Sequence, residues 1–189
     1  RDTQMADNML WLARKRYPDR KIIVWAATMH IQRNPHLIDT RIPEFSYTGI
    51  EPMGHHLFTA MGNDVFTIGF TSFEGQVGLP WGQPSRINPA PEGSLEELCV
   101  RAGLENAYID FRSETTPEWL HQPLVSRPLG HALMEADWAQ VLDGMVFLRT
   151  MTPSTRAGWA PDKIQQWAES KRSSEEQRAK ATDLVGSIE

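Results

Sequence analysis

The chain has 189 residues, of which 40% are hydrophobic and 23% charged, and its formal net charge is −5 at pH 7. This composition is that of an ordinary globular protein and excludes an intrinsically disordered chain. The negative charge gives no basic footprint for nucleic acid or an anionic membrane, and no apolar run reaches the roughly 20 residues that span a bilayer. The single cysteine, Cys99, excludes an intrachain disulfide framework and a cysteine-based metal cluster, and we expect it to be a small buried side chain.

The first part of the chain alternates between helix and strand patterns. Apolar residues recur at helical spacing over residues 3–16, which predicts an amphipathic helix. The β-branched, apolar run at 21–26 predicts a buried strand, and the proline-containing stretch at 31–50 predicts a loop over the carboxyl end of that strand. A second helix is predicted over 52–61, and a second buried strand over 65–70.

The second part begins with a stretch rich in glycine and proline at 71–93, which we expect to be a long loop at the same edge as the first strand's end. A short helix follows at 94–102, where Ser94 has the spacing of an N-cap. Apolar runs at 107–111 and 143–148 predict two more strands.

Strands that alternate with helices predict an α/β fold whose sheet is largely parallel and flanked by helices. Strands this apolar need cover on both faces. Residues 1–160 are therefore expected to form one α/β domain. Residues 161–189 are charged, and we expect them to form a C-terminal helix or tail.

The predicted strand at 21–26 leads through a short polar turn to His30. The carboxyl end of a buried strand is where α/β proteins collect ligands and catalytic groups. A histidine there can act as a general base or acid near neutral pH. It can equally be a structural residue whose ring is satisfied by hydrogen bonds at the strand end, and the segment alone leaves both readings open.

The residues around this strand follow a recognisable order. A helix with "RD..MA.N..WL" leads to a strand with "WA" before the histidine, then to "MG..L" and to a strand ending in "IGF". The matching residues are Arg1, Asp2, Met5, Ala6, Asn8, Trp11, Leu12, Trp25, Ala26, His30, Met53, Gly54, Leu57, Ile68, Gly69 and Phe70. This order resembles the erythromycin esterase-like family, also known as succinoglycan-biosynthesis-related proteins. The match covers about the first 75 residues of the chain.

The resemblance implies a hydrolase that acts on an ester or lactone through water activated by a histidine, with no metal and no cofactor. The best-known substrates of the family are macrolide lactones, whose hydrolysis confers macrolide resistance. His30 would position or activate the water and Glu74 would assist it, while residues 71–93 would form part of the substrate cleft. The expected partner is a small-molecule ester or lactone. Nucleic acid and membranes are not expected partners.

Three further residues are assigned to substrate binding, namely Trp25, His55 and His56. Adjacent residues on a helix point about 100° apart, so we expect only one of the two neighbouring histidines to reach the site. Arg1 and Asp2 form the polar start of the first helix and could form a buried ion pair or reach the substrate, with a structural role favoured.

One departure from the family pattern concerns the end of the first strand. The family strand carries two histidines three residues apart, and this chain has Ala27 where the first is expected. In the family a large upstream part completes the α/β fold and supplies further site residues. The resemblance therefore implies that residues 1–160 are the carboxyl-terminal part of an erythromycin esterase-like α/β domain, which is incomplete without the upstream half and inactive alone. The alternative function is a non-catalytic binding or scaffold domain that keeps the esterase-like fold with a degraded active site.

Other hydrolase and nucleotide motifs are missing from the sequence. It contains no G-x-S-x-G nucleophile elbow, no H-E-x-x-H zinc helix and no phosphate-binding P-loop. The oligomeric state and the compartment are left open by the sequence, with the cytoplasm favoured.

Overall fold

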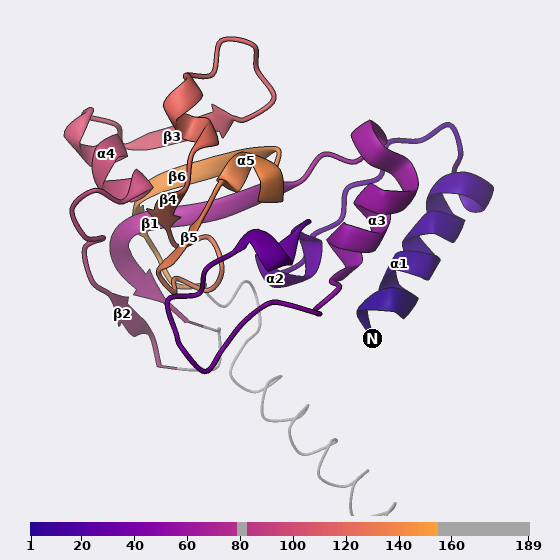
Figure 1. The fold of residues 1–189 in the computed structure, drawn as a ribbon, viewed down its shortest axis with the longest axis horizontal. Coiled ribbons are helices and arrows are strands. Elements are labelled where there is room, and N and C mark those ends of the chain that lie inside the picture. The colour runs from indigo at the N-terminus through magenta and orange to yellow at the C-terminus, as the bar shows by residue number, and fades with distance from the viewer. Residues whose placement is uncertain (79–82, 155–189) are drawn as a thin grey trace, which may run out of the picture. The chain divides into compact units, whose positions relative to one another are not determined.

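A computed structural model describes residues 1–78 and 83–154 of the chain (Figure 1). Its helices are α1 (Asp2–Trp11), α2 (Thr28–Ile31), α3 (Met53–Met61), α4 (Leu95–Arg101) and α5 (Trp138–Val141). Its strands are β1 (Ile68–Val77), β2 (Ser85–Ile87), β3 (Asn106–Asp110), β4 (Leu124–Ser126), β5 (Met134–Ala136) and β6 (Gly144–Met151). The predicted tail at 161–189, and with it the boundary at residue 160, lies outside the described residues.

The main sheet has four strands in the order β2-β1-β6-β3. Only the central pair, β1 and β6, is parallel, with Ile68 opposite Gly144, whereas β2 and β3 run antiparallel to their neighbours. The prediction of a largely parallel sheet is therefore wrong, although the α/β class is correct. The chain returns to β1 as β2 after only residues 78–84, and a connection that short joins antiparallel neighbours. Strands β4 and β5 form a separate antiparallel hairpin.

Residues 21–26 do not form the predicted strand, and this prediction is wrong. Among the described residues their backbone groups make no hydrogen bonds to another segment, and a strand needs a ladder partner. Their side chains are open to solvent, with Ile23 92% and Trp25 84% exposed. The β-branched composition favours a strand locally, but no strand in the described part of the chain pairs with this segment.

The stretch at 71–93 is not the long loop that was predicted. Strand β1 continues through it to Val77, and β2 lies within it. Strand β1 extends into this stretch because it pairs with β6 from Ile68 as far as Gly75, with Glu74 opposite Thr150. Gly75 has a φ of +126° and lies so close to the backbone of Met151 that a side chain would collide with it.

Two clusters of buried side chains hold the described residues together. The larger one packs the sheet against α4 and α5, and its most buried members include Leu95, Trp138, Met145 and Phe147. Cys99 belongs to it as expected, and burial, with a smaller contribution from Glu96, raises the pKa of its thiol to about 11. Ser94 caps α4, because its Oγ accepts a hydrogen bond from the Glu97 amide at 3.3 Å.

The smaller cluster joins α1 and α3, which lie side by side (Figure 1). Ala6 of α1 packs with Met53 and Leu57 of α3, as the helical spacing in both predicted segments requires. Helix α2 approaches α3 at Gly54, where an added Cβ would collide with the carbonyl of Ile31. The three helices therefore meet at the amino-terminal ends of α1 and α3.

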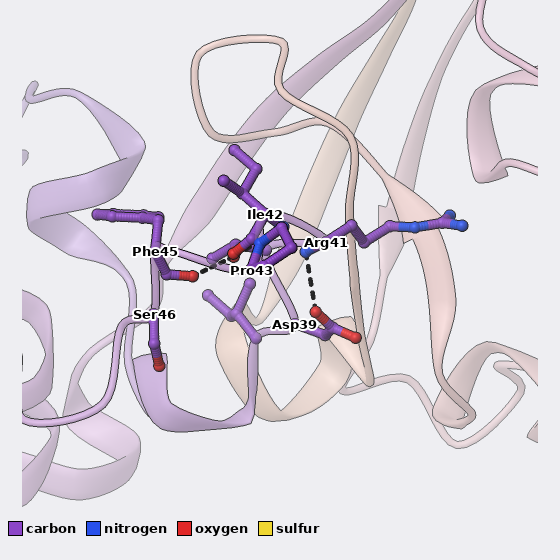
Figure 2. Close-up of a pocket in the computed structure, with 8 residues that line it drawn as sticks. Asp39, Arg41, Ile42, Pro43, Phe45 and Ser46 are labelled. Atoms are coloured by element: carbon purple, nitrogen blue, oxygen red, sulfur yellow. Dashed lines mark hydrogen bonds between the residues drawn. The ribbon is translucent and has the colours of Figure 1, made fainter.

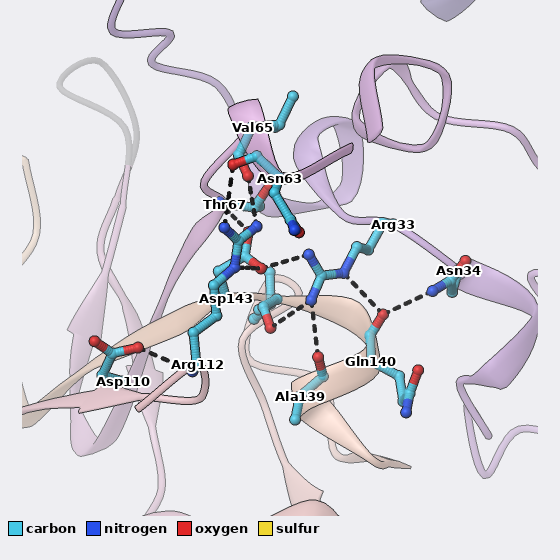
Figure 3. A network of polar contacts seen from close by, with 11 residues as sticks. Arg33, Asn34, Asn63, Val65, Thr67, Asp110, Arg112, Ala139, Gln140 and Asp143 are labelled. Atoms are coloured by element: carbon cyan, nitrogen blue, oxygen red, sulfur yellow. Dashed lines mark hydrogen bonds and ion pairs between the residues drawn. The ribbon is translucent and has the colours of Figure 1, made fainter. Parts of the chain in front are cut away.

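A buried ion network anchors this helical region to the sheet (Figure 3). Asp143 is fully buried just before β6, and its Oδ1 accepts hydrogen bonds from Arg33 and, at 2.6 Å, from Nε of Arg112. Its Oδ2 accepts from the Thr67 amide at 2.7 Å. Because Arg33 lies two residues after the end of α2, the network also fixes that end of the helix. No helix in the described part of the chain is long and apolar enough to cross a membrane.

Candidate active site

His30 lies on the one-turn helix α2 rather than at the end of a strand. Its imidazole faces the first turn of α1, where Oδ2 of Asp2 is 2.8 Å from Nδ1 of the ring. The same carboxylate oxygen accepts a hydrogen bond from the Met53 amide, at 3.3 Å, in the first turn of α3. One carboxylate therefore connects the three helices that meet here, and both side chains of the pair are about one-fifth exposed.

The other ring nitrogen faces a cation. Nη2 of Arg1 is 2.9 Å from Nε2 of His30, and a guanidinium can only donate hydrogen bonds. Nε2 is therefore the accepting atom, and the ring proton of the neutral imidazole lies on Nδ1, where it is donated to Asp2. That hydrogen bond is the largest influence on Asp2 and lowers the pKa of its carboxyl below the ordinary value, against the opposing effect of burial.

The two neighbouring histidines of α3 lie at the same junction. Nε2 of His56 is 3.5 Å from Oγ1 of Thr3 and 3.7 Å from Oε2 of Glu51. Nδ1 of His55 is buried and has no hydrogen-bond partner among the described residues. The structure thus brings His56 against the first turn of α1, which also carries Asp2, but the assignment of both α3 histidines to substrate binding stays a prediction.

Neither Glu74 nor Trp25 makes a hydrogen bond to the residues of this junction in the described structure. Strand β1 passes α2 at Gly69, where an added Cβ would be 3.6 Å from the methyl carbon of Thr28. Glu74 is five residues further along, which is about 16 Å at the rise of an extended strand. No hydrogen bond or ion pair between Glu74 and His30 occurs in the described structure. Trp25 packs its ring against Phe70 at 5.6 Å, and most of its surface faces solvent.

The pocket formed by the loop at 38–46 has a volume of about 440 Å³ and is lined by that loop alone (Figure 2). Asp39 shapes it by accepting a hydrogen bond from the Arg41 amide at 2.8 Å. None of the predicted site residues lines this pocket. In residues 1–78 and 83–154, no three or more histidine, cysteine or carboxylate side chains are grouped as metal ligands.

The comparison with known families decides what kind of protein carries this site. The family model described as erythromycin esterase matches residues 1–151, which include both members of the Asp2–His30 pair. The chain belongs to the erythromycin esterase family. Among curated relatives of this family member, the putative hydrolase YbfO of Bacillus subtilis is 26% identical over 162 residues. Erythromycin esterase type II of Escherichia coli is 27% identical over 155 residues.

Those two matches cover 82% and 77% of this chain, but each covers only 35% of the relative. Solved structures also match most of this chain but only a little over a third of their own length. A succinoglycan biosynthesis protein superposes with a TM-score of 0.59 at 18% identity, over 79% of this chain and 37% of that protein. A mutant of the erythromycin esterase EreC in its open conformation gives 0.56 at 22% identity, over 79% and 36%. The chain spans about a third of the length of the relatives it matches.

Asp2 was expected to form an ion pair or to reach the substrate, with a structural role favoured, and its contact with His30 was not predicted. An acidic residue in the first turn of a helix is ordinary, since it complements the helix dipole. The contact with His30 joins residues 28 positions apart, and no local pattern encodes it. The available signal was that Asp2 and His30 both belong to the motif that the family resemblance selects.

Proposed function

We propose that this chain supplies the catalytic histidine of an ester hydrolase, with His30 as the general base. The supporting observation is the direction of the ring: Nδ1 donates to Asp2, which makes Nε2 the accepting nitrogen, and Nε2 now accepts a hydrogen bond from Arg1. The side chain of Arg1, which now faces Nε2, is 74% exposed and can yield its place to a water molecule. Family membership supports an ester or lactone as the substrate class.

The reaction would proceed in two steps. Nε2 of His30 takes a proton from water while the water oxygen bonds to the carbonyl carbon, which gives a tetrahedral oxyanion. The carbon–oxygen bond to the alcohol then breaks, and the imidazolium returns its proton to the departing alkoxide. The guanidinium of Arg1 is the cation next to the base, so it is placed to donate hydrogen bonds to the oxyanion.

We also propose two residues that would contact the substrate. Trp25 offers an exposed aromatic surface five residues before His30, and His56 lies across the first turn of α1 from it. Both suit a bulky ester or lactone such as a macrolide. Glu74 remains a proposed assistant to His30 that would have to act at a distance in the described arrangement.

A second candidate is a non-catalytic binding or scaffold domain that retains the esterase-like fold. Ala27 favours it, because this exposed residue stands at the N-cap of α2 where the family motif has its first histidine. A site without that imidazole would bind an ester without hydrolysing it.

Ester turnover by the full-length protein and by two histidine variants of it separates the candidates. The substrates are a nitrophenyl ester and a macrolide lactone. We expect His30→Ala to lower kcat by about 10²–10⁴-fold, which is the usual contribution of a general base. His36→Ala is the matched control, because His36 is exposed on another turn and should leave kcat unchanged.

Equal rates for the full-length protein and His30→Ala would show that His30 is not the base. Binding of the macrolide without turnover would favour the scaffold function.

A further inference from the structure

We propose that Asp2 is a positioning residue that holds His30 in the Nδ1–H tautomer and orients its ring toward the substrate. This inference rests on the proposed function, since it assigns the residue through which the base acts. Asp2 would not touch the substrate. Its carboxylate would act entirely through the hydrogen bond to Nδ1.

The geometry of the carboxylate carries the argument. Oδ2 accepts two hydrogen bonds from different elements, the His30 ring at 2.8 Å and the Met53 amide at 3.3 Å. The amide contact fixes the direction in which the carboxylate faces, because the Met53 backbone is part of α3. A carboxylate held at that angle presents one acceptor to the imidazole and selects the tautomer that can donate to it.

The surroundings of the pair leave Asp2 as the natural acceptor for the ring. Three other charged or titratable groups lie around the Asp2–His30 pair. They are Arg1, next to Asp2 in the chain, His56 on α3, and Glu51 just before α3. Arg1 can only donate, and Glu51 is 65% exposed and faces His56. No other carboxylate in the described residues contacts His30. Loss of Asp2 would therefore leave Nδ1 without a charged acceptor.

Nitrogen NMR of the histidine rings reads the tautomer directly. In the ¹⁵N-labelled chain, at a pH at which the ring is neutral, we expect His30 to show a protonated Nδ1 and an unprotonated Nε2. In Asp2→Ala, Nδ1–H should give way to the mixture of tautomers that a solvated imidazole adopts. Asp2→Asn keeps the shape of the side chain but not its charge, and it should give an intermediate population. Asp7→Ala removes an exposed carboxylate from the same helix and should leave the spectrum unchanged.

The proposal is overturned if His30 in the unmodified chain carries its proton on Nε2, a result that does not depend on the folding of any variant. It is also overturned if Asp2→Ala folds and keeps the original tautomer. Ester turnover is measured in parallel, and Asp2→Ala should lower kcat by at least about 10-fold with little change in KM. If Asp2→Ala changes the tautomer of His30 but the unmodified protein hydrolyses no ester, the proposed function is contradicted and the positioning role of Asp2 is kept.

Discussion

Asp143 is a fully buried charged residue that pairs with two arginines. One oxygen of its carboxylate contacts both Arg33 and Arg112, while the second oxygen accepts a hydrogen bond from a backbone amide (Figure 3). Each guanidinium also lies over an aromatic ring, Arg33 over Phe58 and Arg112 over Phe66. A buried ion network contributes little compared with apolar packing, but removing one partner leaves the others uncompensated.

Asp143→Asn should therefore destabilise the fold strongly. The amide keeps the size of the side chain but leaves two arginines without a counter-ion, for which we expect a loss of about 3–5 kcal/mol in the free energy of unfolding. Urea denaturation measures the loss, with Asp64→Asn, an exposed aspartate, as the control. A difference below about 1 kcal/mol between the two variants would show that the network is not needed for stability.

The helices that carry the site depend on one close contact between elements. Helix α2 is a single turn, which is too short to be stable without packing against a neighbour. It is held by Arg33 at its end and by the approach of Ile31 to Gly54 of α3. The position of His30 relative to Asp2 therefore depends on the absence of a side chain at residue 54.

Gly54→Ala tests this dependence. The new methyl group would meet the Ile31 carbonyl, so α2 must move away from α3, and we expect a loss of about 1–3 kcal/mol in stability. The tautomer of His30 should shift as in Asp2→Ala, since the ring would move away from the carboxylate. Thr59→Ala, an exposed position on the same helix, serves as the control. An unchanged His30 spectrum in a folded Gly54→Ala protein would contradict the proposed coupling.

The sequence predicted those elements whose signals are local. The predicted helix at 52–61 is confirmed as α3, with Pro52 before its first turn and Gly62 after its last. The predicted strands at 107–111 and 143–148 match β3 and most of β6. Strands β2, β4 and β5 have three residues each, too few for a periodic pattern. The segment at 21–26 had the right propensity for a strand, but strand formation also needs a neighbour, which composition does not specify.

The candidate site could likewise be predicted only where its signal is local in the sequence. His30 was found because it ends a motif, and the structure places it in a polar junction of three helices. Its link to Asp2 is a tertiary contact between α1 and α2 that depends on how both pack against α3. Glu74 was selected by its position after a predicted strand end, but β1 continues past residue 70 and carries it further from α2.

At the scale of the whole described fold, the half-buried His131 makes stability depend on pH. The pKa of His131 is lowered, first by burial and then by the nearby Arg127 cation, with Glu96 opposing. The folded state therefore prefers the neutral ring. The unfolded chain binds a proton as the pH falls through the ordinary value of 6.5. The contribution of this group to stability is thus fully present above that value and is lost as the pH falls toward the folded-state pKa.

We expect the free energy of unfolding to decrease between about pH 7.5 and about pH 5.5, with a His131 contribution of at most about 1.4 kcal/mol per pH unit. His131→Asn should reduce this slope, and asparagine tolerates the positive φ of 64° at this position. Urea unfolding at a series of pH values measures the slope, with His36→Asn as the control. Equal slopes for the two variants would show that His131 does not titrate between the folded and unfolded states.

The central claim is that Asp2 and His30 act as one unit in ester hydrolysis. A double-mutant cycle on kcat/KM for the hydrolysed ester tests it most directly. If Asp2 acts only through His30, the double variant Asp2→Ala/His30→Ala should be no slower than His30→Ala alone. Effects of the two substitutions that multiply would contradict the account, as would turnover that His30→Ala leaves unchanged.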